Sequence, residues 1–299
     1  MSGGVPVNRR KFIAAGAGAA GLLTTSPGVA QALRGDNTER SRPAGAFKLS
    51  VSRWPYHQFT LDQLSQMARE LGLDSVELLE PEEWAVPKRY GLTCAMGYAT
   101  VPDPRTRLTQ GFNRVENHAW LIPAYQRAIP LAAAAGVPNV ICFSGNRAGM
   151  NDVEGRETCA RGLAPLIPLA ERHGVTLCME LLNSRQDHPD YQCDHTTWGV
   201  ALAKQIASER FKLLYDIYHM QIMEGDVIRT IRDNHQYIGH FHTGGVPGRH
   251  EIDGSQELNY GAIMRAIAET GFKGYVAQEF VPTRDPRTSL AEAVRICRV

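Results

Sequence analysis

Short apolar runs alternate with helical stretches along the chain from residue 47 onward, and this alternation is the strongest constraint on its fold. The runs lie at residues 47–52, 75–79, 92–98, 140–143, 175–180, 211–216, 237–242 and 275–280. Between the first two, Leu61, Leu64, Ala68 and Leu71 recur at helical spacing. Eight strand-and-helix units over about 250 residues predict an α/β fold, a single (β/α)8 barrel.

A doubly wound parallel sheet is the alternative reading of the same alternation. None of the predicted strands is followed by the G-x-G-x-x-G turn that a dinucleotide-binding sheet of this kind would carry. The helix predicted at 119–135 contains Pro123 and Pro130, which we expect to kink or segment it. The polar loops at 99–113 and 183–194 are expected to shape a pocket at the barrel mouth.

The first 32 residues have the composition of an export signal. Asn8, Arg9, Arg10, Lys11 and Phe12 precede a short Ala/Gly/Leu stretch, and Ala-Gln-Ala at 30–32 is a small-x-small cleavage pattern. The paired arginines are typical of a twin-arginine signal, although a basic tail remains an alternative. We therefore expect a cleavable signal peptide at 1–32, a linker at 33–45, a barrel at 46–299, and export to the periplasm.

Charge and cysteine content limit the class of partner. The whole chain has a net charge of +1, and removal of the three basic residues in 1–32 leaves +1 − 3 = −2. No basic surface for nucleic acid is expected from this balance, and the apolar stretch at 14–23 is too short and glycine-rich to span a membrane. The six cysteines form no CxxC pair and are expected to be buried thiols.

Four consecutive late strands end in a side chain that can bind a metal ion. These side chains are Glu180, Asp216, His242 and Glu279. The carboxyl ends of all strands of a (β/α)8 barrel meet at one mouth, so we expect the four to converge there. Three carboxylates and one imidazole make an oxygen-rich donor set, which predicts a divalent cation, Mn²⁺ or Mg²⁺, with Co²⁺ or Zn²⁺ as alternatives.

Longer motifs surround these residues. They are YDIYHMQIMEGD at 215–226, VPGRHE at 246–251, ELNY at 257–260 and FNRVENH at 112–118. In these motifs the chain resembles the hydroxypyruvate isomerase family, within the xylose isomerase-like TIM-barrel superfamily of sugar isomerases and epimerases. The resemblance covers most of residues 47–299.

The resemblance implies roles for individual residues. It implies a divalent metal held by the four strand-end residues, with Glu180 and Glu279 acting as the acid/base pair. His219 and Arg249 match positions that contact substrate in such enzymes, and His250 is a further candidate. One departure is His242, because hydroxypyruvate isomerases place Gln there whereas ketose 3-epimerases of the same superfamily use His.

The predicted function is therefore metal-dependent isomerisation of a small hydroxy-carbonyl compound or sugar, by proton transfer through an enediolate. An epimerase, or a lyase or dehydratase acting on an exported or oxidised sugar, would use the same residues and stays open. So does a non-catalytic carbohydrate-binding barrel. An apurinic endonuclease of this barrel type would need extra histidine ligands and a basic face, which the charge disfavours. Association into a homo-oligomer is left open.

Overall fold

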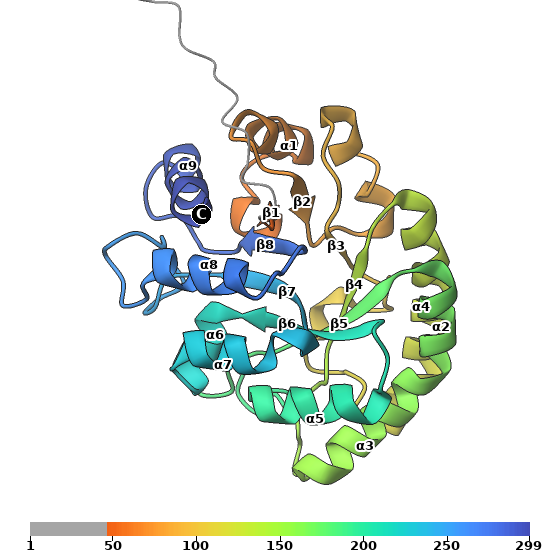
Figure 1. Ribbon diagram of the computed structural model, residues 1–299. Coiled ribbons are helices and arrows are strands. Elements are labelled where there is room, and N and C mark those ends of the chain that lie inside the picture. Colours follow the sequence, from red (N-terminus) through yellow and green to blue (C-terminus); the bar gives the residue numbers. More distant parts are fainter. Residues whose placement is uncertain (1–46) are drawn as a thin grey trace, which may run out of the picture. The chain divides into compact units, whose positions relative to one another are not determined.

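The computed structural model of the protein describes residues 47–299, so the predicted signal peptide and linker lie outside the described residues. Eight parallel strands form one sheet in the order β2-β1-β8-β7-β6-β5-β4-β3 (Figure 1). The strands are β1 Lys48–Ser52, β2 Ser75–Glu77, β3 Met96–Gly97, β4 Asn139–Cys142, β5 Thr176–Glu180, β6 Phe211–Asp216, β7 Ile238–Thr243 and β8 Tyr275–Gln278.

The two ends of this sheet meet, which makes it a nearly closed barrel and not an open doubly wound sheet. Parallel bridges join Ser75 to Thr93 and Leu79 to Gly97, on either side of an irregular stretch. Backbone hydrogen bonds support them, including one from the Leu78 amide to the Met96 carbonyl (2.8 Å). The predicted α/β barrel is therefore present in residues 47–299.

Helices surround the strands on the outside of the barrel (Figure 1). The α-helices are α1 Leu61–Glu70, α2 Val115–Ala135, α3 Asp152–Leu163, α4 Ile167–His173, α5 Thr196–Ile206, α6 Ile217–Met223, α7 Val227–Asn234, α8 Tyr260–Glu269 and α9 Pro286–Cys297. Short 3-10 helices are η1 Trp54–Tyr56, η2 Pro81–Glu83, η3 Pro87–Tyr90, η4 Pro104–Thr106, η5 Ala164–Leu166 and η6 His235–Tyr237.

Local sequence signals fix where several helices begin and end. Thr60 and Gln63 form a reciprocal capping box at the start of α1, an arrangement that satisfies two backbone donors without an intrahelical partner. Asp285 caps α9, with Pro286 as its first residue. Gly136 ends α2 in the left-handed conformation (φ 69°), which glycine adopts without steric cost.

Helix α2 is not segmented at Pro123 and Pro130, and it begins before residue 119, so it is longer than predicted. Each proline removes a helical hydrogen bond at a typical cost of about 3 kcal/mol. Burial of the helix face that includes Leu121, Tyr125 and Ile129 offsets that cost, since packing of an apolar face supplies most helix stability in proteins.

The third strand is also shorter than predicted, with only Met96–Gly97 of the run 92–98 in a continuous ladder. Its backbone passes directly beneath the ring of Trp84. A Cβ placed on Gly97 would lie 2.6 Å from that ring, so the close approach requires glycine here.

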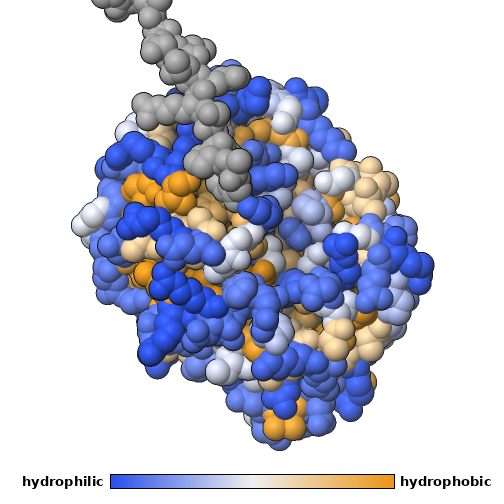
Figure 2. Space-filling model, in the orientation of Figure 1, coloured by the Kyte–Doolittle hydropathy of each residue, from blue (hydrophilic) through white to orange (hydrophobic). Residues whose placement is uncertain are grey.

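The core is made of the strands and the inner faces of the helices. Strands β2, β3, β4 and β8 are buried along their entire length. All six cysteines are free and buried, as predicted. The face shown in Figure 2 is largely hydrophilic with scattered apolar residues. Within residues 47–299, no helix is long and apolar enough to cross a membrane.

Candidate active site

The four predicted metal ligands lie together at the carboxyl end of the barrel. Glu180 and Asp216 end β5 and β6, His242 is the penultimate residue of β7, and Glu279 directly follows β8. One ligand atom from each lies within 4.8 Å of the others. All four side chains are buried.

Asp216 is held by the start of the next helix. Its Oδ1 accepts hydrogen bonds from the backbone amides of Tyr218 (2.9 Å) and His219 (3.2 Å), which makes it the N-cap of α6. Its Oδ2 therefore remains directed toward the centre, where it accepts a hydrogen bond from Arg249 Nη2 (2.8 Å). A strand-end carboxylate followed at once by a helix thus presents one oxygen in a fixed direction.

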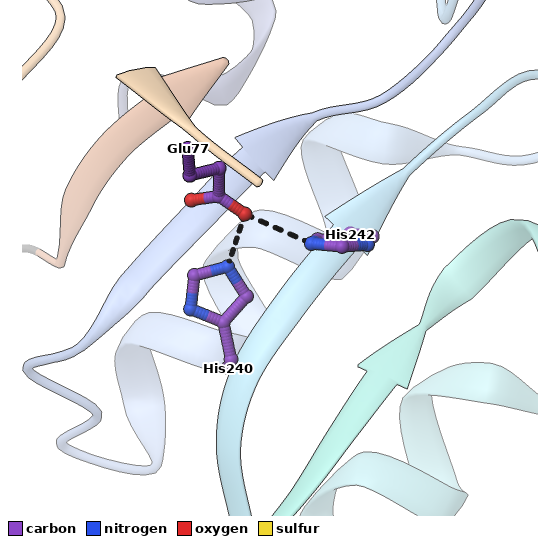
Figure 3. A group of neighbouring side chains, drawn as sticks. All are labelled: Glu77, His240 and His242. Atoms are coloured by element: carbon purple, nitrogen blue, oxygen red, sulfur yellow. Dashed lines mark hydrogen bonds and ion pairs between the residues drawn. The ribbon is translucent and has the colours of Figure 1, made fainter. Parts of the chain in front are cut away.

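His242 connects the two glutamates. Its Nδ1 lies 2.7 Å from Glu279 Oε2 and 3.3 Å from Glu180 Oε1. These are ion-pair contacts and not directed hydrogen bonds, because this buried Nδ1 has no hydrogen-bond partner among the described residues. On the other side of the ring, Nε2 lies 2.9 Å from Glu77 Oε1 (Figure 3).

Glu77 and His240 form a second buried group that the sequence reasoning missed. Both His240 Nε2 (2.8 Å) and His242 Nε2 contact the same oxygen of Glu77 (Figure 3). Two signals could have found them. Glu77 stands near the end of a predicted strand, as the other carboxylates do, and His240 precedes His242 by two residues, which places both on one face of β7.

Arg249 lies directly against the metal-ligand candidates. Its guanidinium donates to Asp216 Oδ2 and to Glu279 Oε2, and its Nε donates to the Glu279 carbonyl (3.2 Å). The rings of Tyr218 and Trp54 lie 5.0 and 5.4 Å from its guanidinium carbon. Trp54 also donates from Nε1 to Glu279 Oε1 (2.6 Å).

The structure separates the two predicted histidines. His219 is fully buried, and its ring nitrogens contact Arg249 Nη1 (2.6 Å) and the Asn183 amide (2.7 Å). It therefore belongs to the centre. His250 is exposed, and its Nδ1 contacts the Val281 carbonyl (3.1 Å). The structure does not bring His250 to the other predicted residues.

Burial and mutual repulsion shift the protonation of the centre. Burial and the neighbouring Glu279 raise the pKa of Glu180. Burial also disfavours the charged form of Glu279, but His242 and Arg249 outweigh it and hold its pKa well below the usual range. Burial opposes protonation of His242, yet Glu279, Glu180 and Glu77 hold its pKa well above the ordinary value. The cluster of carboxylates thus attracts positive charge.

Glu77 is buried within the barrel and still remains ionised. Burial alone would raise its pKa, but His240 and His242 lower it to about 2. Its Oε2 and the Nδ1 of His240 are buried without a hydrogen-bond partner among the described residues. The carboxylate therefore depends on the two Nε2 contacts for its stabilisation.

A pocket of about 380 Å³ opens above the centre. Half of its lining residues are apolar or aromatic, and Glu180, Glu279, His219 and Arg249 are among those that supply polar groups. The remaining lining residues are Trp54, Leu78, Tyr98, Leu108, Phe143, Leu182, Asp187 and His188. Leu108, Asp187 and His188 belong to the two loops predicted to shape the pocket. Its size suits a small molecule.

The strand-end residues fit a divalent cation. Ligands bound at about 2.1 Å lie at most about 4.2 Å apart, so atoms within 4.8 Å of one another need to move only slightly. His242 Nδ1 points at Glu279 and Glu180, so a cation bound among these carboxylates would take the place of the proton that Nδ1 carries in the ion pairs. Three carboxylates and one imidazole suit hard or borderline divalent metals.

Comparison with known proteins gives one family over nearly the whole described chain. The family described as "Xylose isomerase-like TIM barrel" matches residues 44–298. A human relative whose name assigns it as a hydroxypyruvate isomerase is 26% identical over 253 residues, covering 82% of this chain and 84% of the relative. Escherichia coli hydroxypyruvate isomerase is 29% identical over 156 residues, covering 52% and 60%. The 2-oxo-tetronate isomerase of Cupriavidus necator is 35% identical over 127 residues, covering 42% and 48%.

Two solved structures have the same fold. An AP endonuclease, family 2, from Brucella melitensis superposes with a TM-score of 0.73 at 24% identity, covering 82% of this chain and 98% of that one. The 3-keto-D-glucoside 4-epimerase of E. coli superposes with a TM-score of 0.68 at 20% identity, covering 84% and 100%. At these identities the likeness establishes the barrel alone.

Proposed function

Because this chain belongs to the xylose isomerase-like TIM barrel family, we propose that it is a metal-dependent isomerase of a small hydroxy-carbonyl compound or sugar. The names of its relatives, hydroxypyruvate isomerase and 2-oxo-tetronate isomerase, support this reaction class. They also support a small carbonyl or sugar molecule as the substrate.

The observation that carries the proposal is the convergence of Glu180 and Glu279 on His242 at the floor of the pocket. Their oxygens lie 3.3 and 2.7 Å from the same ring nitrogen, although 99 residues separate them along the chain (279 − 180 = 99). A substrate seated above them meets two carboxylates from different strands. Such a pair can remove a proton at one carbon and return it at another.

In the proposed reaction, one glutamate removes the proton from the carbon next to the carbonyl. The C–H electron pair then forms the C=C bond of an enediolate, and the carbonyl oxygen takes up the negative charge. The proton then returns to the former carbonyl carbon. The hydroxyl on the carbon that lost its proton gives up its O–H proton and becomes the new carbonyl, and the former carbonyl oxygen takes up that proton, so the isomerisation is complete without change in composition. A divalent cation held by Glu180, Asp216, His242 and Glu279 would stabilise the negative charge that develops.

Arg249 and His219 complete the polar surroundings of the substrate. The guanidinium fork of Arg249 is suited to a substrate carboxylate or to paired oxygens, and it lies at the pocket wall beside Glu279. His219 Nε2 accepts a hydrogen bond from Arg249 Nη1, so His219 holds the guanidinium on one side of the pocket, where it can donate to substrate oxygens. Trp54, Tyr98 and Phe143 add aromatic surface to the pocket wall.

Exchange with solvent deuterium tests the proposal. We expect the Mn²⁺-loaded protein in D₂O to incorporate deuterium into hydroxypyruvate or into one member of a panel of keto acids and sugars, followed by NMR. Glu180→Gln and Glu279→Gln should fold and bind substrate but lose at least about a thousandfold in kcat. Activity within tenfold of the parent in both variants would contradict the two-base scheme.

Epimerisation is the second candidate function, and His242 is the observation that favours it. Ketose 3-epimerases place histidine at this position, and proton return to the opposite face of the same carbon needs the same two glutamates. Product analysis separates the candidates, since an epimerase yields a ketose of changed configuration and a lyase or dehydratase yields an unsaturated or cleaved product. A protein that neither exchanges deuterium nor binds metal would instead be a binding barrel.

We also propose export to the periplasm, which is based on residues 1–32 alone. A fusion of this segment to a reporter that acts only outside the cytoplasm should be active. Replacement of Arg9 and Arg10 by lysine should abolish that activity, whereas export that persists would indicate a different signal.

A further inference from the structure

We infer that Glu77 is a positioning residue, which holds His242 in the tautomer and orientation that a metal ligand requires, and that His240 holds Glu77 in turn. This inference rests on the proposed metal-dependent function. It extends the site from the four strand-end residues to a buried layer beneath them, formed by Glu77 and His240.

The geometry places Glu77 on the side of the His242 ring that faces away from the other carboxylates. Glu77 Oε1 lies 2.9 Å from His242 Nε2 (Figure 3). Nδ1 of the same ring lies 2.7 Å from Glu279 Oε2. A carboxylate accepts hydrogen bonds and donates none, so Nε2 must carry the proton in this contact. In the neutral ring the lone pair then resides on Nδ1, which is the atom directed at the centre.

His240 holds the carboxylate of Glu77, which in turn orients the ring of His242. Its Nε2 lies 2.8 Å from the same Glu77 oxygen, and its ring stacks on Tyr275 with centroids 6.5 Å apart. The three side chains of Glu77, His240 and His242 have no solvent exposure. Water is therefore not available to replace either contact, and an incorrectly oriented ring would leave a buried polar group without a partner.

The three side chains could alternatively bind a second metal ion, because their ligand atoms also lie within 4.8 Å of one another. The hydrogen-bonding arrangement favours the positioning role. The Nε2 atoms of His240 and His242 approach the same oxygen of Glu77 at hydrogen-bond distances of 2.8 and 2.9 Å. Histidine ligands in metal sites commonly donate their second ring N–H to a carboxylate, and loss of that partner typically weakens metal affinity 10–100-fold.

Metal binding by Glu77→Gln tests the inference directly. We expect the parent to bind one Mn²⁺ per chain in calorimetric titration, and Glu77→Gln to bind one Mn²⁺ with a Kd 10–100-fold higher. The matched control is Glu224→Gln, which removes a carboxylate that accepts two hydrogen bonds from Thr196 outside the centre. Its Mn²⁺ Kd should stay within about twofold of the parent.

The tautomer of His242 gives a second readout, independent of activity. In ¹⁵N-histidine NMR of the Zn²⁺-loaded protein, both His240 and His242 should carry the proton on Nε2. In Glu77→Gln, the His242 signals should no longer show the Nε2-protonated tautomer alone. Where Glu77→Gln does not fold, His240→Asn decides, since it should raise the Mn²⁺ Kd because Glu77 is less firmly held.

Distinct results separate this inference from the proposed function. A parent that binds Mn²⁺ but isomerises nothing would contradict the function, while weaker binding by Glu77→Gln would still support the positioning role. Unchanged Mn²⁺ affinity and an unchanged His242 tautomer in Glu77→Gln, or unchanged affinity in His240→Asn where that variant decides, would overturn the inference. The inference would also be overturned by a parent that binds neither Mn²⁺ nor Zn²⁺, or by a parent that binds two ions per chain and loses one of them in Glu77→Gln.

Discussion

Replacement of Glu251 by glutamine should weaken the barrel in a way that depends on pH. Glu251 belongs to the loop after β7, and its buried side chain faces the segment before α9. Its Oε1 accepts hydrogen bonds from the Thr283 amide (2.9 Å) and Ser289 Oγ (2.8 Å), and its Oε2 accepts one from Thr283 Oγ1 (2.8 Å). Arg284 lies 3.6 Å away. The variant keeps the shape of the side chain and removes its charge.

The size of the effect follows from the pKa of Glu251. Burial alone would raise this pKa, but hydrogen bonds from its own amide, Ser289 and Thr283 lower it from 4.5 to about 2. A group whose pKa is depressed in the folded state stabilises the protein above its unfolded pKa and loses that effect as pH falls toward its folded pKa. A difference of about 2.5 pKa units corresponds to about 3 kcal/mol at pH 7 and about 2 kcal/mol at pH 3.5.

Urea unfolding of the parent and Glu251→Gln at pH 7 and pH 3.5 measures this contribution. We expect the difference in unfolding free energy between the two proteins to shrink by about 1 kcal/mol at the lower pH. At pH 7 the melting temperature of the variant should be lower by about 6–12 °C for a barrel of this size. A difference that is the same at both pH values would refute the reasoning, because it would mean that the charge of Glu251 contributes nothing.

Three further predictions follow from the site and the barrel. Chelation of divalent metal should abolish activity, and Mn²⁺ at 100 times its Kd should restore it and stabilise the fold by about 2.7 kcal/mol, seen as a higher melting temperature. Arg249→Ala should raise KM at least about tenfold with a smaller effect in Arg249→Lys, whereas equal KM values for all accepted substrates would contradict substrate binding by this residue. Gly97→Ala should cost about 1–3 kcal/mol in denaturant unfolding because its Cβ would lie 2.6 Å from Trp84, while Gly254→Ala, with open space around it, should change stability by less than about 0.5 kcal/mol.

The sequence predicted the barrel well wherever a local pattern decides the structure. The strand at 211–216 has the predicted bounds, because an apolar run defines it. Patterns were less informative at 92–98, where only Met96–Gly97 joins a continuous ladder and the backbone at Gly97 lies against Trp84. The continuous helix through Pro123 also depends on packing that its own sequence does not reveal.

The residues of the site that stand at strand ends could be predicted from the sequence. The rule that strand ends meet brought Glu180 and His242 together without any knowledge of the loops. Trp54 was not predictable, because it lies in a 3-10 turn and reaches Glu279 across 225 residues of sequence. Glu77 was within reach of the same rule, but nothing in its local sequence indicates that two histidines share its oxygen.

The capping role of Asp216 has a consequence for the order in which the centre assembles. Its contacts to the amides of residues 218 and 219 are local, so the β6–α6 turn can orient this carboxylate as soon as it forms. Glu180, His242 and Glu279 arrive from strands that meet only when the barrel has formed. A partly folded chain would then offer a cation one prepared ligand instead of four. Metal uptake during refolding would therefore report completion of the barrel, and should lag behind the recovery of helical signal.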